Sequence, residues 1–327
     1  ISVLLVTTIF SAADMIIRGE TVTMQAKHGN WHIQVNNISD EIAEEISNRP
    51  DVTAVGWSAV FNEDADQPYT IGERKATLYG TDETYLAQLA DGMEEGAFPQ
   101  SDQEVVLSSN AKLALDVQLG DSVTVQTPAG NVDLTISGFG SDDQEYYEGQ
   151  TYLVAVYMTK DAFVSLMNEN GVSDYAPACY MQFQSAAKAA DAIAEIQTQY
   201  SLPEGSIREN TAIMGLAGQS SNESMQNVYG LAAILFIMVL LAGVLMISGS
   251  MNSQVAQRTK FFGMMRCIGA SRKQVIRFVR LEALNWCKTA IPIGLIVGTV
   301  ITWAVCALLR YGIGGEFAGT PVFALSP

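Results

Sequence analysis

The sequence predicts an α+β extracytoplasmic domain inserted between α-helical transmembrane segments. Two long runs without a charged residue lie toward the C-terminal end, at residues 228–247 and 289–309. Between residues 18 and 227 the chain instead alternates strand-like and helix-like stretches. The charges are also segregated: residues 18–227 hold 32 acidic and 9 basic side chains, whereas residues 258–288 hold one acidic and eight basic side chains.

Both uncharged runs are long enough to cross a bilayer. They hold 20 and 21 residues, and at about 1.5 Å per residue each spans roughly 30 Å, the thickness of the hydrocarbon layer. Two buried helices of a large soluble core are the alternative, but soluble helices rarely stay apolar on every face over such a length. We therefore predict transmembrane helices at residues 228–250 and 289–309.

The N-terminal residues 1–17 are apolar apart from Asp14. A signal peptide with Ala12 and Ala13 near its cleavage site would have a similar apolar stretch, but it would also have a basic region before that stretch. We interpret residues 1–17 as part of a first transmembrane helix, truncated at its start, with Arg18 at its exit from the membrane.

The charge asymmetry predicts the orientation. Cytoplasmic loops beside membrane helices are enriched in Lys and Arg, so we expect the basic loop 251–288 in the cytoplasm. Residues 18–227 and 310–327 are then extracytoplasmic, and the protein is a multi-pass protein of a bacterial plasma membrane. The whole chain has 35 acidic and 18 basic residues, and we expect no nucleic-acid partner.

The acidic segment reads as an α+β domain with no internal repeat, followed by a stalk at residues 211–230 that could extend the second membrane helix. Predicted strands cover residues 31–37, 52–61, 76–80, 104–107, 151–158 and 179–184, with a hairpin at 122–139 around Pro128-Ala129-Gly130. Predicted helices cover residues 39–49, 109–117, 160–169 and 185–200.

No enzymatic site is predicted. The motifs GxSxG, HExxH and Walker A do not occur in the sequence. His28 and His32 could form a metal-binding pair, but two exposed histidines at a domain edge are favoured because no Cys or Glu ligand is indicated nearby. The acidic, aromatic stretch 141–152 could contact a cationic peptide, although a solvated loop is favoured. Cys179 is the only cysteine of the acidic segment, so that segment has no internal disulfide.

The basic loop reads as two helices. Phe261, Met264, Met265 and Ile268 recur with helical spacing and form one apolar face. Gly269 follows at the place of a left-handed C-terminal residue, and Ser271 with Gln274 matches a capping box that starts the second helix. The apolar face can pack against a partner protein or against lipid, and periodicity alone does not decide between them.

Two further patterns mark the last helices. Basic residues recur along one side of the second loop helix and suit anionic lipid headgroups: Lys273, Arg277 and Arg280. Small residues occupy every fourth position of the third membrane helix and favour helix–helix contact: Ala290, Gly294, Gly298, Thr302 and Cys306. Pro292 is expected to kink this helix near its inner end.

Residues 258–270, RTKFFGMMRCIGA, resemble the cytoplasmic loop of MacB/FtsX-type permeases of ABC transporters, the mechanotransmitting type VII class. That loop typically reads R-x-x-E-(apolar)-G-x-x-(R/K)-x-(apolar)-G-A, and this chain has Phe261 in place of the Glu. Residues 104–125, EVVLSSNAKLALDVQLGDSVTV, resemble the outer domain of the family. The layout agrees along the chain, except that the family's fourth helix is missing after Pro327.

The resemblance implies that the short loop helix docks into a groove on a cytoplasmic ATPase, which binds the ATP while this chain binds no cofactor. The implied coupling residues are Phe261, Phe262, Gly263, Met264, Met265, Arg266, Ile268 and Gly269. It further implies a homodimer, or a pseudo-dimer with a second permease half, that exports or extracts a hydrophobic or peptide substrate. An FtsX-like scaffold that regulates a cell-wall hydrolase is the alternative, and a membrane receptor is a third possibility.

Overall fold

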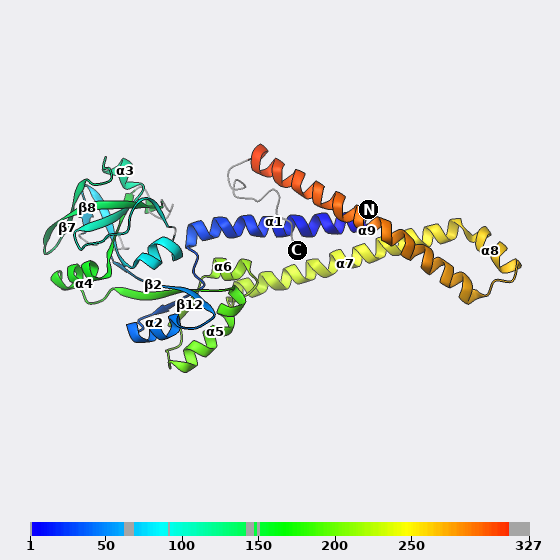
Figure 1. Cartoon of the computed structure of the whole chain (residues 1–327), viewed down its shortest axis with the longest axis horizontal. Helices are drawn as coiled ribbons and strands as arrows, with labels where there is room; N and C mark the ends of the chain where they lie inside the picture. The colour runs from blue at the N-terminus through cyan, green and yellow to red at the C-terminus, as the bar shows by residue number, and fades with distance from the viewer. Residues whose placement is uncertain (1, 62–68, 91, 142–146, 149–150, 314–327) are drawn as a thin grey trace. The chain divides into compact units, whose positions relative to one another are not determined.

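The computed structural model describes residues 2–61, 69–90, 92–141, 147–148 and 151–313, and the chain divides into two units (Figure 1). Residues 23–222 form the first, which we call the α+β unit. Residues 1–22 and 223–327 form the second, which we call the helical unit. This division agrees with the predicted fold class, an α+β domain inserted between long helices.

Twelve strands of the described part of the α+β unit form one sheet. They are β1 (Ile33–Asn36), β2 (Val52–Phe61), β3 (Thr70–Ile71), β4 (Arg74–Thr81), β5 (Met93–Gly96), β6 (Glu104–Ser108), β7 (Ser122–Thr127), β8 (Gly130–Gly140), β9 (Tyr147–Glu148), β10 (Thr151–Thr159), β11 (Ala176–Phe183) and β12 (Ile207–Glu209). The helices between them are α2 (Asp40–Ser47), α3 (Ala111–Ala114), α4 (Lys160–Glu169), α5 (Ala186–Gln199) and α6 (Thr211–Leu216), with a π-helical turn, η1 (Tyr85–Leu89).

Part of the sheet closes on itself. Strands β4, β3, β7, β8, β6 and β10 follow one another, and β10 then pairs in parallel with β4. Helix α4 covers this ring and inserts Phe163 and Met167, both fully buried, into its core. Gly80 permits this packing, because a Cβ at that position would lie 2.5 Å from the Phe163 ring.

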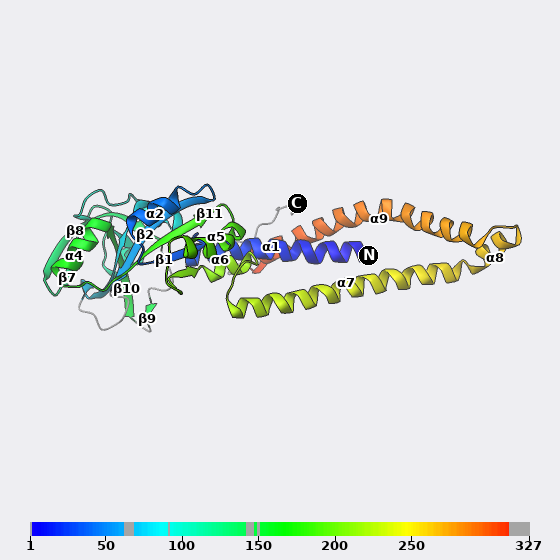
Figure 2. The same cartoon turned by 90° about the horizontal axis from the view of Figure 1, so that it is seen from below.

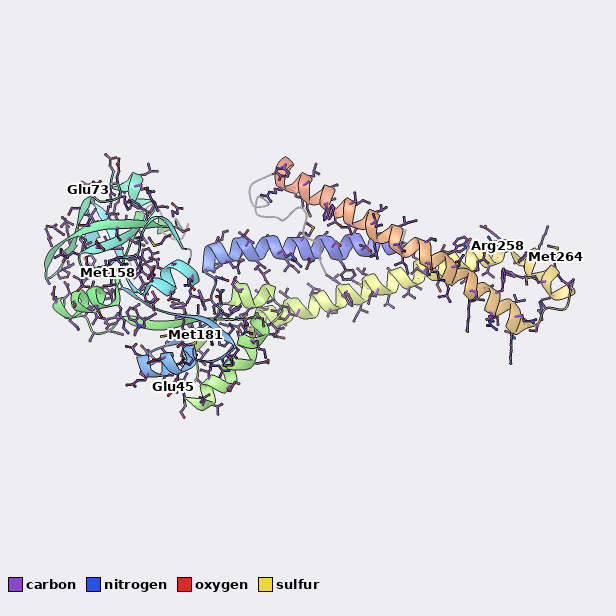
Figure 3. All side chains as sticks on the ribbon, viewed as in Figure 1. Glu45, Glu73, Met158, Met181, Arg258 and Met264 are labelled. Atoms are coloured by element: carbon purple, nitrogen blue, oxygen red, sulfur yellow. The ribbon has the colours of Figure 1, made fainter. Side chains whose placement is uncertain are left out.

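The remaining strands extend the sheet as an antiparallel layer in the order β12-β1-β11-β2, joined to the ring through β4. Helices α2 and α5 bury their apolar faces against this layer, with Ile46 and Ile196 in its core. Met158 belongs to the core of the ring and Met181 to the core of the layer, so the two labelled methionines mark the two regions in Figure 3.

Helix caps, hairpin turns and hydrophobic periodicity in the sequence predicted most of the helices and strands. Ser39 caps α2 by accepting a hydrogen bond from the Ile42 amide, and α4 spans the predicted residues with Asn170 as its C-cap. The predicted hairpin forms from β7 and β8, which pair Thr127 with Gly130. The short strands β3, β5, β9 and β12 and the turn η1 were not predicted, because two to five residues carry too little periodicity.

Two predicted helices differ from the structure. The predicted helix 109–117 is reduced to the single turn α3, because Asp116 has a positive φ of 56° that ends the helix. The stalk is not continuous with the second membrane helix: α6 ends at Leu216 and Gly218 has a φ of 71°. The Glu209 carboxylate holds the break by accepting hydrogen bonds from Ser220, Ser221 and Asn222.

The described part of the helical unit contains the long helices α1 (Ser2–His28, which runs on into the α+β unit), α7 (Glu223–Gln257) and α9 (Arg272–Leu308). The short helix α8 (Thr259–Cys267) lies between α7 and α9, and the turn η3 (Leu309–Ile313) follows α9. Within the described residues, Glu223–Gln257 and Arg272–Gly312 are long and apolar enough to cross a membrane. Helix α1 does not stop at Arg18, whose guanidinium pairs with Asp14 one turn earlier.

The small-residue stripe of α9 is a contact face, as predicted. Gly294, Gly298, Thr302 and Cys306 are all buried, whereas Ala290 is exposed. The Cys306 thiol lies 3.7 Å from the Met15 sulfur, so α1 packs on this stripe. Small side chains let two helix backbones approach closely, which explains the spacing of four.

A fragment of residues 23–222 should fold without the helical unit. It contains its own hydrophobic cores, and its one cysteine, Cys179, is buried with a pKa raised to about 11 by desolvation. We expect a single cooperative thermal transition by circular dichroism, with the same midpoint in the presence and absence of reductant. A fragment that ends at Asn210 lacks the partners of Glu209 and should be less stable by about 1–3 kcal/mol. A gradual, non-cooperative melt of the longer fragment would contradict this prediction.

Candidate functional site

Helix α8 joins the ends of α7 and α9, as two perpendicular views show (Figures 1 and 2). It ends in a Schellman motif: Gly269 has a φ of 94°, its N–H donates to the Arg266 carbonyl at 3.1 Å, and the Ala270 N–H donates to the Met265 carbonyl at 3.0 Å. Gly269 thus ends the helix as the sequence predicted, by adopting a conformation that other residues rarely take.

The next helix starts with the predicted capping box. The Gln274 N–H donates to the Ser271 hydroxyl oxygen at 3.3 Å, and the Ser271 N–H donates to the Gln274 side-chain oxygen at 2.8 Å. An ion pair between Arg258 and Glu282 connects the start of α8 to α9. The loop is therefore a defined pair of helices with a fixed turn between them.

The apolar side chains among the implied coupling residues divide into two groups. Phe262 and Met265 are half-buried, and Phe262 lines a 240 Å³ cavity between α7, α8 and α9 together with Val255 and Val279. In contrast, Met264 is 62% exposed and Ile268 is 87% exposed. Side chains that already pack inside the chain cannot also bind a partner. Of the predicted contact residues, Met264 and Ile268 are thus the most available, and Figure 3 shows Met264 on α8.

The other predicted coupling residues also have defined places. Phe261 is 43% exposed, and its ring centroid lies 6.2 Å from that of Phe278 on α9. Gly263 is exposed, and a Cβ built on it meets nothing within 4 Å. Arg266 is exposed and lines a groove with Arg272 and Arg280. The outward surface of α8, which we call the tip surface, consists of Gly263, Met264 and Ile268.

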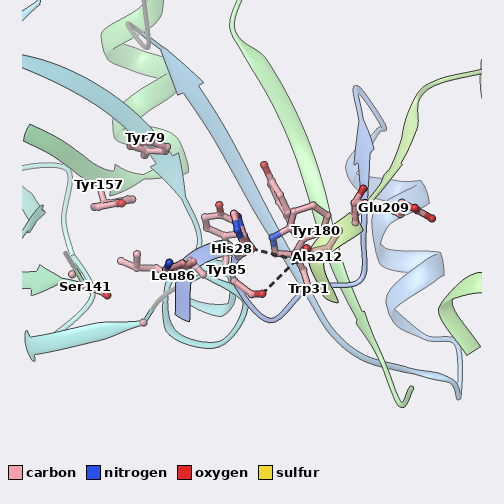
Figure 4. A pocket seen from close by; sticks show the side chains of 17 residues that line it. His28, Trp31, Tyr79, Tyr85, Leu86, Ser141, Tyr157, Tyr180, Glu209 and Ala212 are labelled. Carbon is pink, nitrogen blue, oxygen red and sulfur yellow. Dashed lines mark hydrogen bonds between the residues drawn. The ribbon is translucent and has the colours of Figure 1, made fainter. Parts of the chain in front are cut away.

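A second candidate site lies in the α+β unit. It is a cavity of about 480 Å³ at which aromatic residues of different elements converge (Figure 4). Aromatic side chains among its described lining residues are Trp31, Tyr79, Tyr85, Tyr157 and Tyr180. We call it the aromatic cavity. No sequence pattern indicated it, because these five residues are scattered over 150 positions of the chain.

Strand register brings these rings together. Tyr79 and Tyr157 are directly opposite each other in the parallel pair of β4 and β10, and their rings stack with centroids 4.8 Å apart. Tyr180 on β11 contacts Trp31 at 5.1 Å and Tyr85 at 4.6 Å between ring centroids. Strands of the ring, a strand of the outer layer and one turn thus supply rings to a common space.

The turn η1 depends on close backbone contacts. Gly56, the partner of Tyr180 in the strand pair, lies under η1, and a Cβ there would lie 2.7 Å from the Tyr85 backbone. The Asp82 carboxylate accepts hydrogen bonds from the Tyr85 and Trp57 amides, both at 2.7 Å. Burial raises the pKa of Asp82, although these two hydrogen bonds and Lys160 act in the opposite direction.

The two histidines have different environments. His28 is exposed at the end of α1, whereas His32 is partly buried. The prediction of two exposed histidines is therefore wrong for His32, whose Nδ1 accepts a hydrogen bond from the Phe183 N–H at 3.0 Å. The described residues contain no cluster of three metal-ligating side chains. Most of the stretch 141–152 lies outside the described residues.

Two family models match the sequence. The MacB-like periplasmic core domain matches residues 1–199, which is well over half of the chain, and the C-terminal domain of FtsX-like permeases matches residues 233–324. The chain belongs to the MacB/FtsX-type permease family. This confirms the resemblance inferred from residues 104–125 and 258–270. No protein with a curated description matches this permease.

Solved structures give a weaker likeness. The permease is 14% identical to the periplasmic region of MacB from Actinobacillus actinomycetemcomitans, with a TM-score of 0.40 over 61% of this chain and 98% of that chain. It is also 14% identical to a domain from Porphyromonas gingivalis described as belonging to a permease, with a TM-score of 0.36 over 56% of this chain and 89% of that chain. The family assignment rests on the sequence models alone.

Membership in the family decides the broad properties. FtsX-like permeases are membrane-embedded components of ABC transporters, whose ATPase is a partner of the permease and which are generally not enzymes by themselves. The long apolar helices α7 and α9 fit a membrane-embedded permease. We accordingly treat the tip surface as the candidate site for the partner and the aromatic cavity as a separate candidate.

The partly buried His32 makes the stability of the α+β unit dependent on pH. Desolvation lowers its pKa below the unfolded value of 6.5, so the unfolded chain binds the proton more tightly. The stability contributed by neutral His32 is therefore complete above pH 6.5 and is lost as the pH falls from 6.5 toward the lower folded-state pKa. Protonation at Nδ1 also removes the bond from Phe183.

Urea unfolding of the 23–222 fragment at several pH values measures this effect. His32→Asn places an amide oxygen near the position of Nδ1 but does not titrate. We expect the wild-type fragment to lose more stability than the variant between pH 7.5 and 5.5. Equal losses in both proteins would show that the pKa of His32 is the same in the folded and unfolded states, and would contradict this prediction.

Proposed function

We propose that this permease is the membrane subunit of an ABC transporter and that a separate cytoplasmic ATPase docks on the tip surface of α8. The observation that carries the proposal is the exposure of apolar Met264 and Ile268 next to Gly263, on a short helix between two helices of membrane-spanning length. Apolar anchors at the centre of a contact supply most of its binding energy, and an exposed glycine lets the partner backbone approach closely.

The ATP belongs to the partner in this proposal. The sequence has no Walker A motif, so this chain responds to the nucleotide only through contact. Because α8 is held by a Schellman motif, a capping box and the Arg258–Glu282 ion pair, a displacement of α8 moves the adjoining helix ends with little local unfolding.

Helix α7 would carry the movement outward. It is one uninterrupted helix of 35 residues from Glu223 to Gln257. The residues just before it, 220–222, donate hydrogen bonds to Glu209 of β12 and are thereby held to an edge strand of the α+β unit. A helix that is hydrogen-bonded along its whole length transmits an axial displacement, and the Glu209 contacts pass it to the sheet.

The work done outside is the export or extraction of a hydrophobic or peptide substrate. The match of residues 1–199 to the MacB-like core domain favours this function over an FtsX-like scaffold for a cell-wall hydrolase, because the chain shares its outer domain with the former. Two permease halves, identical or related, would present two α8 helices to two ATPases.

Lipid is a second partner in this proposal. Lys273, Arg277 and Arg280 are exposed on α9. Arg280 also lines the groove with Arg266 and Arg272, whose apolar floor includes Val275 and Val279. Guanidinium groups around an apolar floor suit an anionic headgroup with its acyl chain. These charges would hold the loop at the inner membrane surface.

Cysteine labelling tests the orientation. Asn131 in the β7–β8 hairpin and Ser271 at the start of α9 are both exposed. In intact cells, a membrane-impermeant maleimide should label Asn131→Cys but not Ser271→Cys, because the positive-inside rule places the basic loop in the cytoplasm. Permeabilised cells are the control, in which both positions should react. The reverse pattern in intact cells would overturn the proposed coupling as well.

The tip surface can be tested by substitutions that leave the chain's own packing intact. Met264→Gln nearly keeps the size of the side chain and Ile268→Thr keeps its β-branching, and each adds a polar group. Gly263→Leu adds a side chain where the chain has open space. Each should weaken the complex with the co-purifying ABC ATPase by about 5- to 150-fold, the equivalent of 1–3 kcal/mol for an anchor residue. Co-purification from detergent at a series of ATPase concentrations measures the change.

Matched controls separate docking from lipid contact. Lys273→Gln and Arg277→Gln should retain the ATPase, because these residues are assigned to headgroups. Phe262→Ala is expected to reduce ATPase binding only by loosening α8 against α9, so it should also lower the thermal stability of the permease. Wild-type ATPase binding by all three tip-surface variants would refute docking on α8.

A further inference from the structure

The aromatic cavity is distinct from the tip surface, and nothing in ATPase coupling requires it. Its volume of about 480 Å³ lies within the range of small-molecule sites, roughly 300–1,000 Å³. Rings that only complete a hydrophobic core fill the space between them. Here Trp31, Tyr79 and Tyr180 remain partly exposed and border an open space.

The wall of the cavity includes an irregular element. Tyr85 begins the π-helical turn η1, and π-helical turns occur frequently at functional sites. Gly56 beneath the turn and the partly buried Asp82 just before it fix the position of Tyr85. Gly29 supports its far end: the Asn30 N–H donates to the Leu89 carbonyl at 2.7 Å, and a Cβ on Gly29 would lie 2.3 Å from that oxygen.

The cavity also contains a fixed negative charge. Glu209 lines it and accepts hydrogen bonds from Ser220, Ser221 and Asn222 (Figure 4 shows Glu209 beside the group of Trp31 and Tyr180). Burial raises the pKa of this carboxyl, but the hydrogen bonds outweigh burial and the net pKa is lowered. Glu209 is therefore ionised at neutral pH.

The charge of the surrounding domain has the same sign. Residues 18–227 hold 32 acidic and 9 basic residues, and such an excess concentrates cations near the surface. Lys27 and His28 also line the cavity, but both are exposed at the end of α1. Water and salt screen charges in such positions more than they screen a partly buried carboxylate.

We propose that the aromatic cavity binds an organic cation, a quaternary ammonium or similar group. Aromatic ring faces attract cations through their quadrupole, and several rings with one carboxylate form a cage in which the cation is partly desolvated. A neutral sugar is the other ligand that aromatic walls accommodate. Its hydroxyls would gain little from Glu209, because both carboxylate oxygens already accept hydrogen bonds from residues 220–222. The acidic domain would not concentrate a neutral molecule either, so the charges favour the cation.

The first test uses the full-length permease in lipid nanodiscs, without ATP or ATPase. This makes its outcome independent of the coupling proposal. Isothermal titration calorimetry compares choline and benzyltrimethylammonium with 3,3-dimethylbutanol, in which carbon replaces the charged nitrogen of choline. We expect both cations to bind, choline at least about tenfold more tightly than its neutral counterpart. Maltose should not compete with them.

The second test uses matched substitutions. Tyr79→Leu and Tyr180→Leu should each weaken cation binding by about 2- to 30-fold, whereas Tyr79→Phe and Tyr180→Phe keep the ring face and should bind like the wild type. Tyr200→Leu is the control, since Tyr200 lies outside the cavity in the same unit. Glu209→Gln should weaken choline binding without changing that of 3,3-dimethylbutanol, and Lys27→Gln should strengthen choline binding at low salt.

Three results would overturn the proposal. One is the absence of binding by both cations to the wild-type permease, and another is equal affinity for choline and its neutral counterpart. The third is maltose binding that displaces the cations, which would assign the cavity to carbohydrate. If a Leu variant does not melt cooperatively, its binding is not used, and the comparison of choline with its neutral counterpart on the wild-type permease still decides.

Discussion

The arrangement of the α+β unit depends on one strand that is paired on both edges. β4 pairs with β10 in parallel, which closes the ring, and with β2 antiparallel, which attaches the outer layer. Tyr79, near the middle of β4, is opposite Val60 on one edge and Tyr157 on the other. A one-residue slip of this strand would turn every side chain to the opposite face. It would separate the Tyr79–Tyr157 stack and displace η1, which directly follows β4.

Two glycines allow the elements around the sheet to pack closely in this register. Gly56 and Gly80 lie on adjacent strands and leave room for different neighbours: Gly56 for the backbone of Tyr85, and Gly80 for the ring of Phe163. In each case a single methyl group would force apart elements that lie far from each other in sequence. The same property operates at Gly263, where the space above the backbone is open within this chain. Gly56 and Gly80 therefore allow close packing inside the α+β unit. Gly263 leaves room for the backbone of a partner protein at the helical unit.

The helical unit follows a different rule, because its exposed surface is apolar. Helix α7 has exposed apolar side chains on all sides over its membrane-spanning window, whereas α9 buries only the stripe that meets α1. Lipid satisfies such a surface, so the burial of a few small residues is sufficient for helix contact. The charged residues of this unit are concentrated in the loop around α8, where the chain meets water. The tip surface thus lies in a charged loop next to apolar helices, whereas the aromatic cavity lies in an acidic α+β unit.

The sequence alone determined the features that depend on composition and local capping. It identified the fold class, the apolar helices, the Schellman glycine Gly269 and the Ser271–Gln274 capping box, because each is encoded within a few residues. It also identified the family through residues 258–270. Only the tertiary structure separated the implied coupling residues into two groups, since the sequence cannot tell that Phe262 packs inside the chain while Ile268 does not.

Features that depend on contacts between distant segments of the chain became visible only in the tertiary structure. His32 is partly buried where its ring accepts a hydrogen bond from the Phe183 N–H, 151 positions away. The break before α7 results from the contacts of Glu209 as well as from Gly218. The aromatic cavity combines residues whose proximity is set by the register of long-range strand pairs. The register of these strand pairs depends on contacts throughout the sheet. A short sequence window shows periodicity, but it does not show which strands pair or in which register.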